Sequence, residues 1–226
     1  MLVSHVCRFI YLKTIKTAGT SVEVYFEPFC VDPKAWQGEL HGRGELVSEF
    51  GIVGARGSEG RPATGGMTWY NHMPASEVAA KLPAEIWNSY YRFCIVRDPW
   101  DKVVSQFWYH LSPSERTALA GSEFSTVRGA LSQWLQKGRL PLDRQIYTLN
   151  GKSAVDEMIR YENLLPDMER LCRRLGIPWQ PQRLGKYKSG YRPRQELARE
   201  YFDDAAAAQI RGVFAWEFEN LGYSFV

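Results

Sequence analysis

The sequence predicts an α/β layer fold with a central, mostly parallel sheet flanked by helices. Two apolar, β-rich runs, residues 6–12 and 91–96, each pass directly into a basic loop and then into a helical pattern. A third strand is expected at 157–162. Strands that alternate with helices along a chain favour a parallel sheet with helices packed against it.

Length and composition predict one globular domain over residues 1–226, because 45% of the residues are hydrophobic and 23% are charged. The formal net charge of +3 is too small to indicate a nucleic-acid-binding surface. The four cysteines form no C-x-x-C pair, so neither a metal site nor a disulfide framework is expected. No apolar run reaches the ~18 residues of a transmembrane helix, which predicts a soluble, cytoplasmic protein.

The stretch YLKTIKTAGTSVEVYF (11–26) has the composition of an anion-binding loop between a strand and a helix. Thr20 and Glu23 have the spacing of a capping box, which predicts that a helix begins at Thr20. Gly19 permits a tight turn before it, and Lys16 supplies a cation. The N–H groups and dipole of a helix N-terminus attract anions. Since the G-x-x-x-x-G-K-[ST] pattern is absent, an ATP triphosphate is not the predicted ligand.

A second unit of the same kind begins at Arg97. Asp98 is expected to cap a helix whose first residue is Pro99, with Asp101 three residues beyond the cap. Ser105 follows Arg97 by eight residues, about 12 Å of helical rise. The core-facing residues of this helix are predicted to be Val103, Val104, Phe107, Trp108 and Leu111. The alternative is that Arg97 only pairs with Asp98 or Asp101, and that Ser105 is an ordinary surface hydroxyl.

Further helices are predicted at 75–89, 124–137, 162–174 and 194–219. The glycine-rich stretch 54–66 is expected to be a surface loop, either a connector or a lid. The loop 183–194 has five basic residues among twelve and no acid.

Two motifs together resemble a known family. KTAGTS after a strand resembles the 5′-phosphosulfate loop of sulfotransferases that use 3′-phosphoadenosine 5′-phosphosulfate (PAPS), and FCIVRDPWDKVVSQF (93–107) resembles their 3′-phosphate segment. The similarity is greatest to carbohydrate sulfotransferases, including short bacterial members and the heparan-sulfate 2-O-sulfotransferase group. Ile15 stands where that family often has proline. The resemblance implies a P-loop NTPase-like three-layer fold, with PAPS as donor and its desulfated form, PAP, as product.

The resemblance also implies roles for particular residues. Arg97 and Ser105 would bind the 3′-phosphate, and Lys188 and Ser189 of the basic loop are expected to reach the nucleotide, with a solvated charged loop as the alternative. The loop around the 5′-phosphosulfate would be formed by Lys16, Thr17, Ala18, Gly19, Thr20 and Ser21.

Sulfuryl transfer needs a cation at the leaving oxygen and a base for the acceptor hydroxyl. By resemblance, Lys16 is the cation and His72, in WYNHMPASEV (69–78), is the base. Of the other histidines, His5 and His41 are expected to be structural or solvated, and His110 is expected at a helix end, in a position to interact with the helix dipole. No metal is required by this chemistry.

The predicted partner is a hydroxyl-bearing acceptor, a glycan or another small molecule, which the sequence does not name. Two other functions stay open. One is a P-loop-type small-molecule kinase, although no acid for Mg²⁺ clearly follows a strand. The other is a nucleotide-binding module without catalysis.

Overall fold

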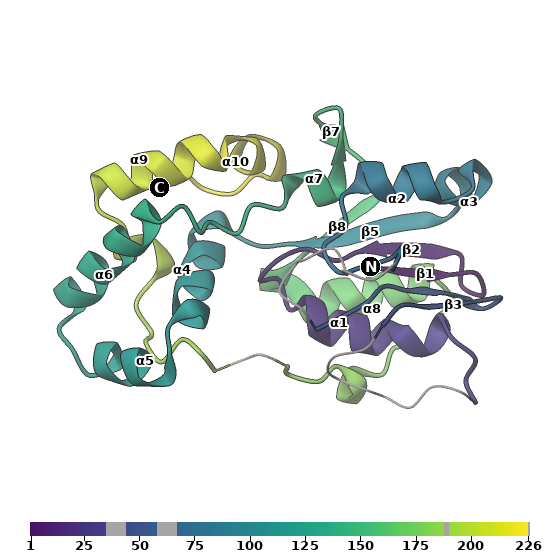
Figure 1. The fold of residues 1–226 in the computed structure, drawn as a ribbon, viewed down its shortest axis with the longest axis horizontal. Coiled ribbons are helices and arrows are strands. Elements are labelled where there is room, and N and C mark those ends of the chain that lie inside the picture. The colour runs from purple at the N-terminus through teal and green to yellow at the C-terminus, as the bar shows by residue number, and fades with distance from the viewer. Residues whose placement is uncertain (35–43, 58–66, 188–189, 226) are drawn as a thin grey trace. The chain divides into compact units, whose positions relative to one another are not determined.

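The computed structural model describes residues 1–34, 44–57, 67–187 and 190–225 (Figure 1). The chain divides into two compact units. The first contains residues 1–96 and 143–187, and the second contains residues 97–142 and 188–226. The expectation of a single domain over the whole chain stays an expectation.

The first unit has a six-stranded sheet. Its strands, in order of pairing, are β3 (Leu46–Ser48), β4 (Gly51–Val53), β1 (Leu2–Ser4), β2 (Phe9–Leu12), β5 (Tyr91–Val96) and β8 (Glu157–Arg160). β2, β5 and β8 are parallel, as expected, and Leu12 lies opposite Cys94. The pairs β3–β4, β4–β1 and β1–β2 are antiparallel, so the sheet as a whole is mixed. The predicted α/β class with a central sheet flanked by helices is confirmed.

Helices cover both faces of this sheet. Figure 1 shows α1 and α8 on one side and α2 and α3 on the other. The helices of the unit are α1 (Gly19–Phe26), α2 (Ala75–Lys81), α3 (Ala84–Ser89), the single turn α7 (Arg144–Tyr147) and α8 (Leu164–Arg174). Short 3₁₀ turns lie at Glu27–Phe29, Tyr161–Asn163 and Pro181–Arg183. A small hairpin of two short strands, β6 (Thr148–Leu149) and β7 (Lys152–Ser153), follows α7.

An aromatic cluster fixes β2 and β5 beneath α1. The rings of Phe9, Phe26 and Phe93 lie 5.3–5.7 Å apart, and Tyr11 stacks on Phe93 at 5.0 Å. All four side chains are fully buried. Burial of one such ring contributes roughly 1.5–3 kcal/mol, so this cluster holds the end of β2, where the predicted anion loop begins.

Two element boundaries differ from the sequence prediction in this unit. The strand expected at 6–12 begins only at Phe9, because residues 5–8 turn back from β1 and Arg8 has a φ of 51°. The helix expected at 75–89 is two helices. Leu82 precedes Pro83, whose ring disfavours helical backbone in the residue before it, and Leu82 is extended.

The second unit is helical in its described residues. It contains α4 (Pro99–His110), α5 (Pro113–Ala120), α6 (Phe124–Gln136), a 3₁₀ turn η4 (Ala198–Tyr201), α9 (Asp204–Val213) and α10 (Ala215–Leu221). Trp100 of α4 packs on Phe202 and Phe218, with ring centroids at 5.1 and 5.4 Å.

The helices near 124–137 and 162–174 are confirmed as α6 and α8. The helix expected at 194–219 was wrong as a single element. Phe202 is extended, and Asp203 caps a new helix by accepting a hydrogen bond from the Ala206 N–H at 2.8 Å. Leu111 is extended and lies just beyond α4. Within the described ranges, none of the helices has the length and apolar character needed to cross a membrane.

Candidate functional site

The predicted anion loop lies at the carboxyl end of β2 and leads into α1. Lys16 and Ala18 both have a φ of 59°, in the left-handed region. Ile15, before Lys16, and Thr17, between the two, have a negative φ. Alternation of this kind makes successive backbone N–H groups converge on one concave side, where an anion can bind. Left-handed backbone is costly for residues other than glycine, so the rest of the fold must hold it in place.

Three contacts hold the loop against the sheet. The Thr14 hydroxyl donates to the carbonyl of Ile95 in β5 and lies 2.7 Å from the Thr17 hydroxyl. The Ile15 N–H donates to the buried carboxylate of Asp143 at 2.7 Å. The Thr17 hydroxyl is therefore engaged inside the protein, and only the backbone of Thr17 is a candidate anion donor.

The predicted capping box is wrong. α1 begins at Gly19, its N-cap is Ala18, and no side chain caps it. Glu23 is instead fully buried, and its Oε2 lies 2.6 Å from the Lys13 ammonium and 3.1 Å from the Arg56 guanidinium. Arg56 also meets Glu27 at 3.0 Å. Burial alone would raise the pKa of Glu23, but the surrounding cations, Lys13 foremost, lower it to about 2.

His72 lies against the start of the loop. Its Nδ1 is 3.0 Å from the carbonyl oxygen of Lys13, 59 residues away. A carbonyl only accepts, so Nδ1 carries the proton and Nε2 carries the lone pair. Burial, and next the charge of Lys13, lower the pKa of His72 to about 3, so the ring is neutral near pH 7.

The segment that carries His72 is held by backbone pairing with the first residues of the glycine-rich stretch. The Ala55 N–H donates to Trp69 O at 2.9 Å, and the Asn71 N–H donates to Ala55 O at 3.0 Å. Glycine suits position 54, because a Cβ there would lie at a tight 3.2 Å from the backbone of Tyr70. His72 itself has a φ of 60°. Residues 58–66 lie outside the described residues, so the choice between connector and lid stays open.

The other loop residues have definite places. Gly19 is the first residue of α1, and a Cβ there would lie 3.1 Å from Lys13 Cγ and from Thr14 O. The Ser21 hydroxyl accepts a hydrogen bond from the Tyr187 N–H at 3.3 Å, so the basic loop begins beside α1. Lys188 and Ser189, which follow Tyr187, lie outside the described residues, and so does His41.

His5 and His110 have local roles. Nδ1 of His5 lies 3.0 Å from the Tyr90 hydroxyl, and Nε2 of His110 lies 3.3 Å from the Gln106 amide in the last turn of α4. Neither of these contacts involves a residue of the loop, whereas the contact of His72 does.

In the second unit, Asp98 caps α4 as predicted, accepting from the Trp100 N–H at 2.8 Å, and Pro99 is the first helical residue. Asp101 forms no capping box. Its carboxylate accepts from Nε and Nη2 of Arg97 at 2.8 and 2.7 Å, which is the ion pair that the sequence left as an alternative.

Arg192 also meets Asp101, at 2.7 Å from its Nη1. Sequence reasoning counted Arg192 in the basic loop but gave it no role, because nothing local connects residues 91 positions apart. Asp101 thus holds two guanidinium groups side by side. Ser105 is partly buried and lies one helical turn after Asp101, on the same face of α4.

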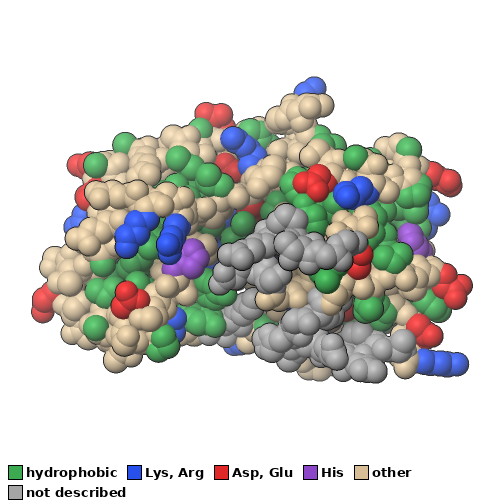
Figure 2. Space-filling view, viewed as in Figure 1, with side chains coloured by type: hydrophobic (Ala, Val, Ile, Leu, Met, Phe, Trp, Pro, Cys, Tyr) green, Lys and Arg blue, Asp and Glu red, His purple; other side chains and the backbone are tan. Residues whose placement is uncertain are grey.

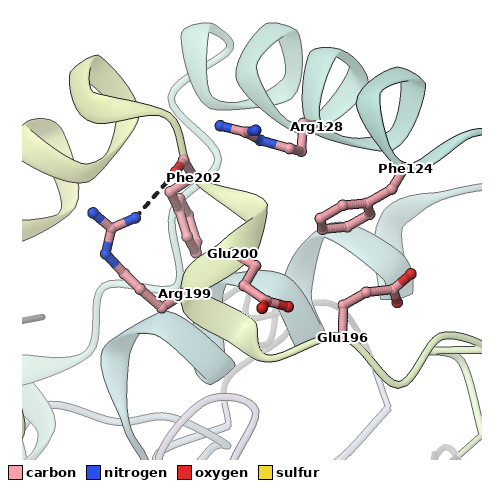
Figure 3. Close-up of a pocket in the computed structure, with 6 residues that line it drawn as sticks. All are labelled: Phe124, Arg128, Glu196, Arg199, Glu200 and Phe202. Carbon is pink, nitrogen blue, oxygen red and sulfur yellow. Dashed lines mark hydrogen bonds between the residues drawn. The ribbon is translucent and has the colours of Figure 1, made fainter.

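The second unit also has an open hollow of about 550 Å³ (Figure 3). It is lined by Phe124, Arg128, Glu196, Arg199, Glu200 and Phe202. None of the predicted site residues that the structure describes lines it, and its two arginines are matched by two glutamates, so we assign it no part of the chemistry. Figure 2 shows positive and negative side chains interspersed over the viewed face of the molecule.

The fold and these contacts define an α/β protein with a left-handed loop, a buried cation and a neutral histidine together at the end of a parallel strand. No family model and no solved structure matches the chain. An uncharacterized protein of Archaeoglobus fulgidus is 30% identical to it over 109 residues, 47% of this chain and 84% of that protein. The chain therefore belongs to one family with this archaeal protein.

The backbone of the loop gives a stability prediction. Ala18→Gly is expected to raise the free energy of unfolding by about 1 kcal/mol, because glycine adopts a φ of 59° without a Cβ penalty. Gly19→Ala is the matched control and should lower it, since its Cβ would press on Lys13 and Thr14. Urea unfolding of the three proteins measures both changes. A loss of stability in Ala18→Gly would contradict the loop geometry.

Proposed function

We propose that the chain is a sulfotransferase with a P-loop NTPase-like fold, which transfers a sulfuryl group from PAPS to an acceptor hydroxyl. The carrying observation is the contact of His72 with the Lys13 carbonyl. It joins the residue expected to be the base to the loop expected to hold the sulfuryl donor, and the two are distant in sequence.

The loop suits the leaving group of this reaction. The backbone N–H groups of Lys16 to Thr20 and the amino end of α1 attract the 5′-phosphosulfate. Lys16 stabilises the negative charge that develops on the bridging oxygen as its bond to sulfur breaks. The Thr17 hydroxyl contributes less, because it is already engaged within the protein. The Ser21 oxygen accepts the Tyr187 N–H, which leaves its own O–H to donate to the anion.

His72 suits the acceptor side. In the reaction, the acceptor oxygen bonds to sulfur while the bond from sulfur to the phosphate oxygen breaks and PAP leaves with the electron pair. The acceptor proton passes to Nε2 of His72. The Lys13 carbonyl stabilises the resulting imidazolium through Nδ1–H. A bound polyanionic donor raises the basicity of His72, because nearby negative charge favours the protonated ring.

The other end of the nucleotide is assigned to Arg97 and Ser105. Asp101 pairs with Arg97, and a phosphate would offer the same guanidinium a stronger, bidentate partner. Arg192 shares the Asp101 carboxylate and joins Arg97 in this assignment. The acceptor is a hydroxyl-bearing glycan or small molecule.

Titration calorimetry tests the function. PAP is expected to bind in the micromolar range, while ATP with Mg²⁺ binds far more weakly. Arg97→Ala should weaken PAP by about 10–100-fold, since hydrogen bonds to charged groups contribute roughly 1.5–3 kcal/mol. The exposed Arg173, which pairs with Glu169 on α8, provides the control Arg173→Ala, with unchanged affinity.

Tight binding of ATP–Mg²⁺ without PAP would favour a kinase. PAP binding without transfer to any acceptor in a screen with labelled PAPS would favour a non-catalytic module.

A further inference from the structure

Asp143 joins the anion loop to a segment that is distant in the sequence. Its Oδ2 accepts a hydrogen bond from the Ile15 N–H at 2.7 Å, across 128 positions of the chain. The residue is 0% exposed. Because Ile15 directly precedes Lys16, a buried carboxylate from elsewhere in the chain holds the residue next to the cation of the proposed site.

The residues around Asp143 fix the position of its carboxylate. Asp143 stands at the N-cap position of α7, where an aspartate commonly caps its own helix, but its side chain makes no such hydrogen bond. Ile146 and Tyr147 of α7 are each 1% exposed. α7 packs against α2, which begins three residues after His72 (Figure 1). The carboxylate is therefore held in the core of the first unit, and it serves the anion loop in place of its own helix.

We propose that Asp143 is a positioning residue for the donor site: by accepting the Ile15 N–H, it sets the left-handed backbone of Lys16 before the anion binds. The inference rests on the proposed function, in which the loop holds the 5′-phosphosulfate and Lys16 acts at the leaving oxygen. In this proposal Asp143 acts through the loop and does not contact the donor.

The physical reason is the conformation of the loop. Lys16 and Ala18 both have a φ of 59°, which is unfavourable for residues with a Cβ. A loop that took up this conformation only on binding would hold the anion more weakly, because ordering the chain costs free energy. The Asp143 hydrogen bond offsets that cost during folding. It also occupies the Ile15 N–H, so the backbone donors left for the anion begin at Lys16.

The hydrogen bond is the property of Asp143 that the proposal uses, and the negative charge is not. A carboxylate close to a bound polyanion repels it, so the charge by itself weakens binding. Asparagine keeps a side-chain oxygen that can accept the Ile15 N–H, and it carries no charge. Alanine removes the oxygen and the charge together. The two contributions can therefore be separated by comparing Asp143→Asn with Asp143→Ala.

Amide hydrogen exchange in the full chain tests the contact without any activity. In the wild-type chain, the Ile15 amide should be protected from exchange by a factor of about 100 or more, because exchange requires the loop to open. Asp143→Ala should remove most of this protection, and Asp143→Asn should keep most of it. An Ile15 amide that exchanges freely in the folded wild-type chain would overturn the proposal, even if both variants fail to fold.

Titration with PAP tests the consequence for the site. Asp143→Ala is expected to weaken PAP by about 10-fold or more, because the loop loses a hydrogen bond to a charged group and must be ordered on binding. Asp143→Asn should bind PAP at least as tightly as the wild-type chain. Asp167 provides the matched control: it is also buried and accepts a backbone N–H, that of Arg160, at 3.1 Å. Asp167→Ala should leave the PAP affinity within about twofold, since its partners lie outside the loop.

Two results of this titration would overturn the proposal. One is a folded Asp143→Ala protein that binds PAP as tightly as the wild-type chain. The other is an equal loss of affinity in Asp143→Asn and Asp143→Ala, since the retained oxygen would then have no effect. Inorganic sulfate, titrated in the same way, separates this proposal from the proposed function. If the wild-type chain binds no PAP but binds sulfate with the same dependence on residue 143, the proposed function fails while the role of Asp143 in the anion loop stands.

Discussion

His72→Gln is expected to reduce sulfuryl transfer by about 10²–10⁴-fold, the range that general-base catalysis contributes. Glutamine can keep a hydrogen bond from its amide to the Lys13 carbonyl, so the loop should retain its shape. The glutamine amide cannot take up the proton that the acceptor hydroxyl loses while its oxygen bonds to sulfur. The affinity for PAP should stay within about twofold, because His72 does not hold the nucleotide in the proposed site.

Two measurements on the same protein separate the possible outcomes. Single-turnover transfer from labelled PAPS gives the rate, and PAP titration gives the affinity. His110→Gln, at the exposed end of α4, is the control and should match the wild-type protein in both. Full activity in His72→Gln would remove His72 from the mechanism. If the rate and the PAP affinity fall equally, the substitution has damaged the loop, and the loss of rate is not due to the loss of a base.

Glu23→Ala is expected to lower the free energy of unfolding by about 3–5 kcal/mol, because it leaves buried cations without their common carboxylate. Lys13 and Arg56 are both within 3.1 Å of Glu23 Oε2, and all three side chains are buried. Glu85→Ala, on the exposed surface of α3, is the control and should change stability by no more than about 0.5 kcal/mol. Urea unfolding at pH 7 measures both.

A double variant distinguishes loss of charge balance from loss of packing. Lys13→Met with Glu23→Gln removes one cation and the anion together and leaves Arg56 paired with Glu27. This protein should be more stable than Glu23→Ala, since the Lys13 ammonium is no longer left without a carboxylate. If the double variant is as unstable as Glu23→Ala, packing of the Glu23 side chain outweighs its charge.

The Glu23 network also determines how the free energy of unfolding changes as the pH falls. The folded chain holds the pKa of Glu23 near 2, below its ordinary value of 4.5, so the unfolded chain binds more protons between these values. The stabilisation is therefore complete above about pH 4.5 and is lost as the pH falls toward 2. Variants without Glu23 should lose less stability than the wild-type chain over this range.

Local sequence signals determined much of the framework. The apolar runs that became β2 and β5, the cap and proline at Asp98 and Pro99, and the loop ending at Gly19 depend on neighbours in the chain, so they could be predicted from it. The pairing of Arg97 with Asp101 is also local, one helical turn apart, and was foreseen as an alternative. The P-loop NTPase-like identity and the donor nucleotide come from resemblance and stay proposals.

Tertiary structure decided what spacing could not. Glu23 stands three residues after Thr20, a spacing that fits a capping box, but its burial beside Lys13 and Arg56 places it in a charge network instead. The mixed sheet depends on β1, β3 and β4, whose pairing joins distant segments. His72 and Arg192 acquired partners 59 and 91 residues away. The sequence itself shows a loop that contains a lysine, and a histidine elsewhere in the chain. Only folding places His72 against Lys13, where the ring is neutral, because burial and neighbouring charge depend on which residues pack together in space.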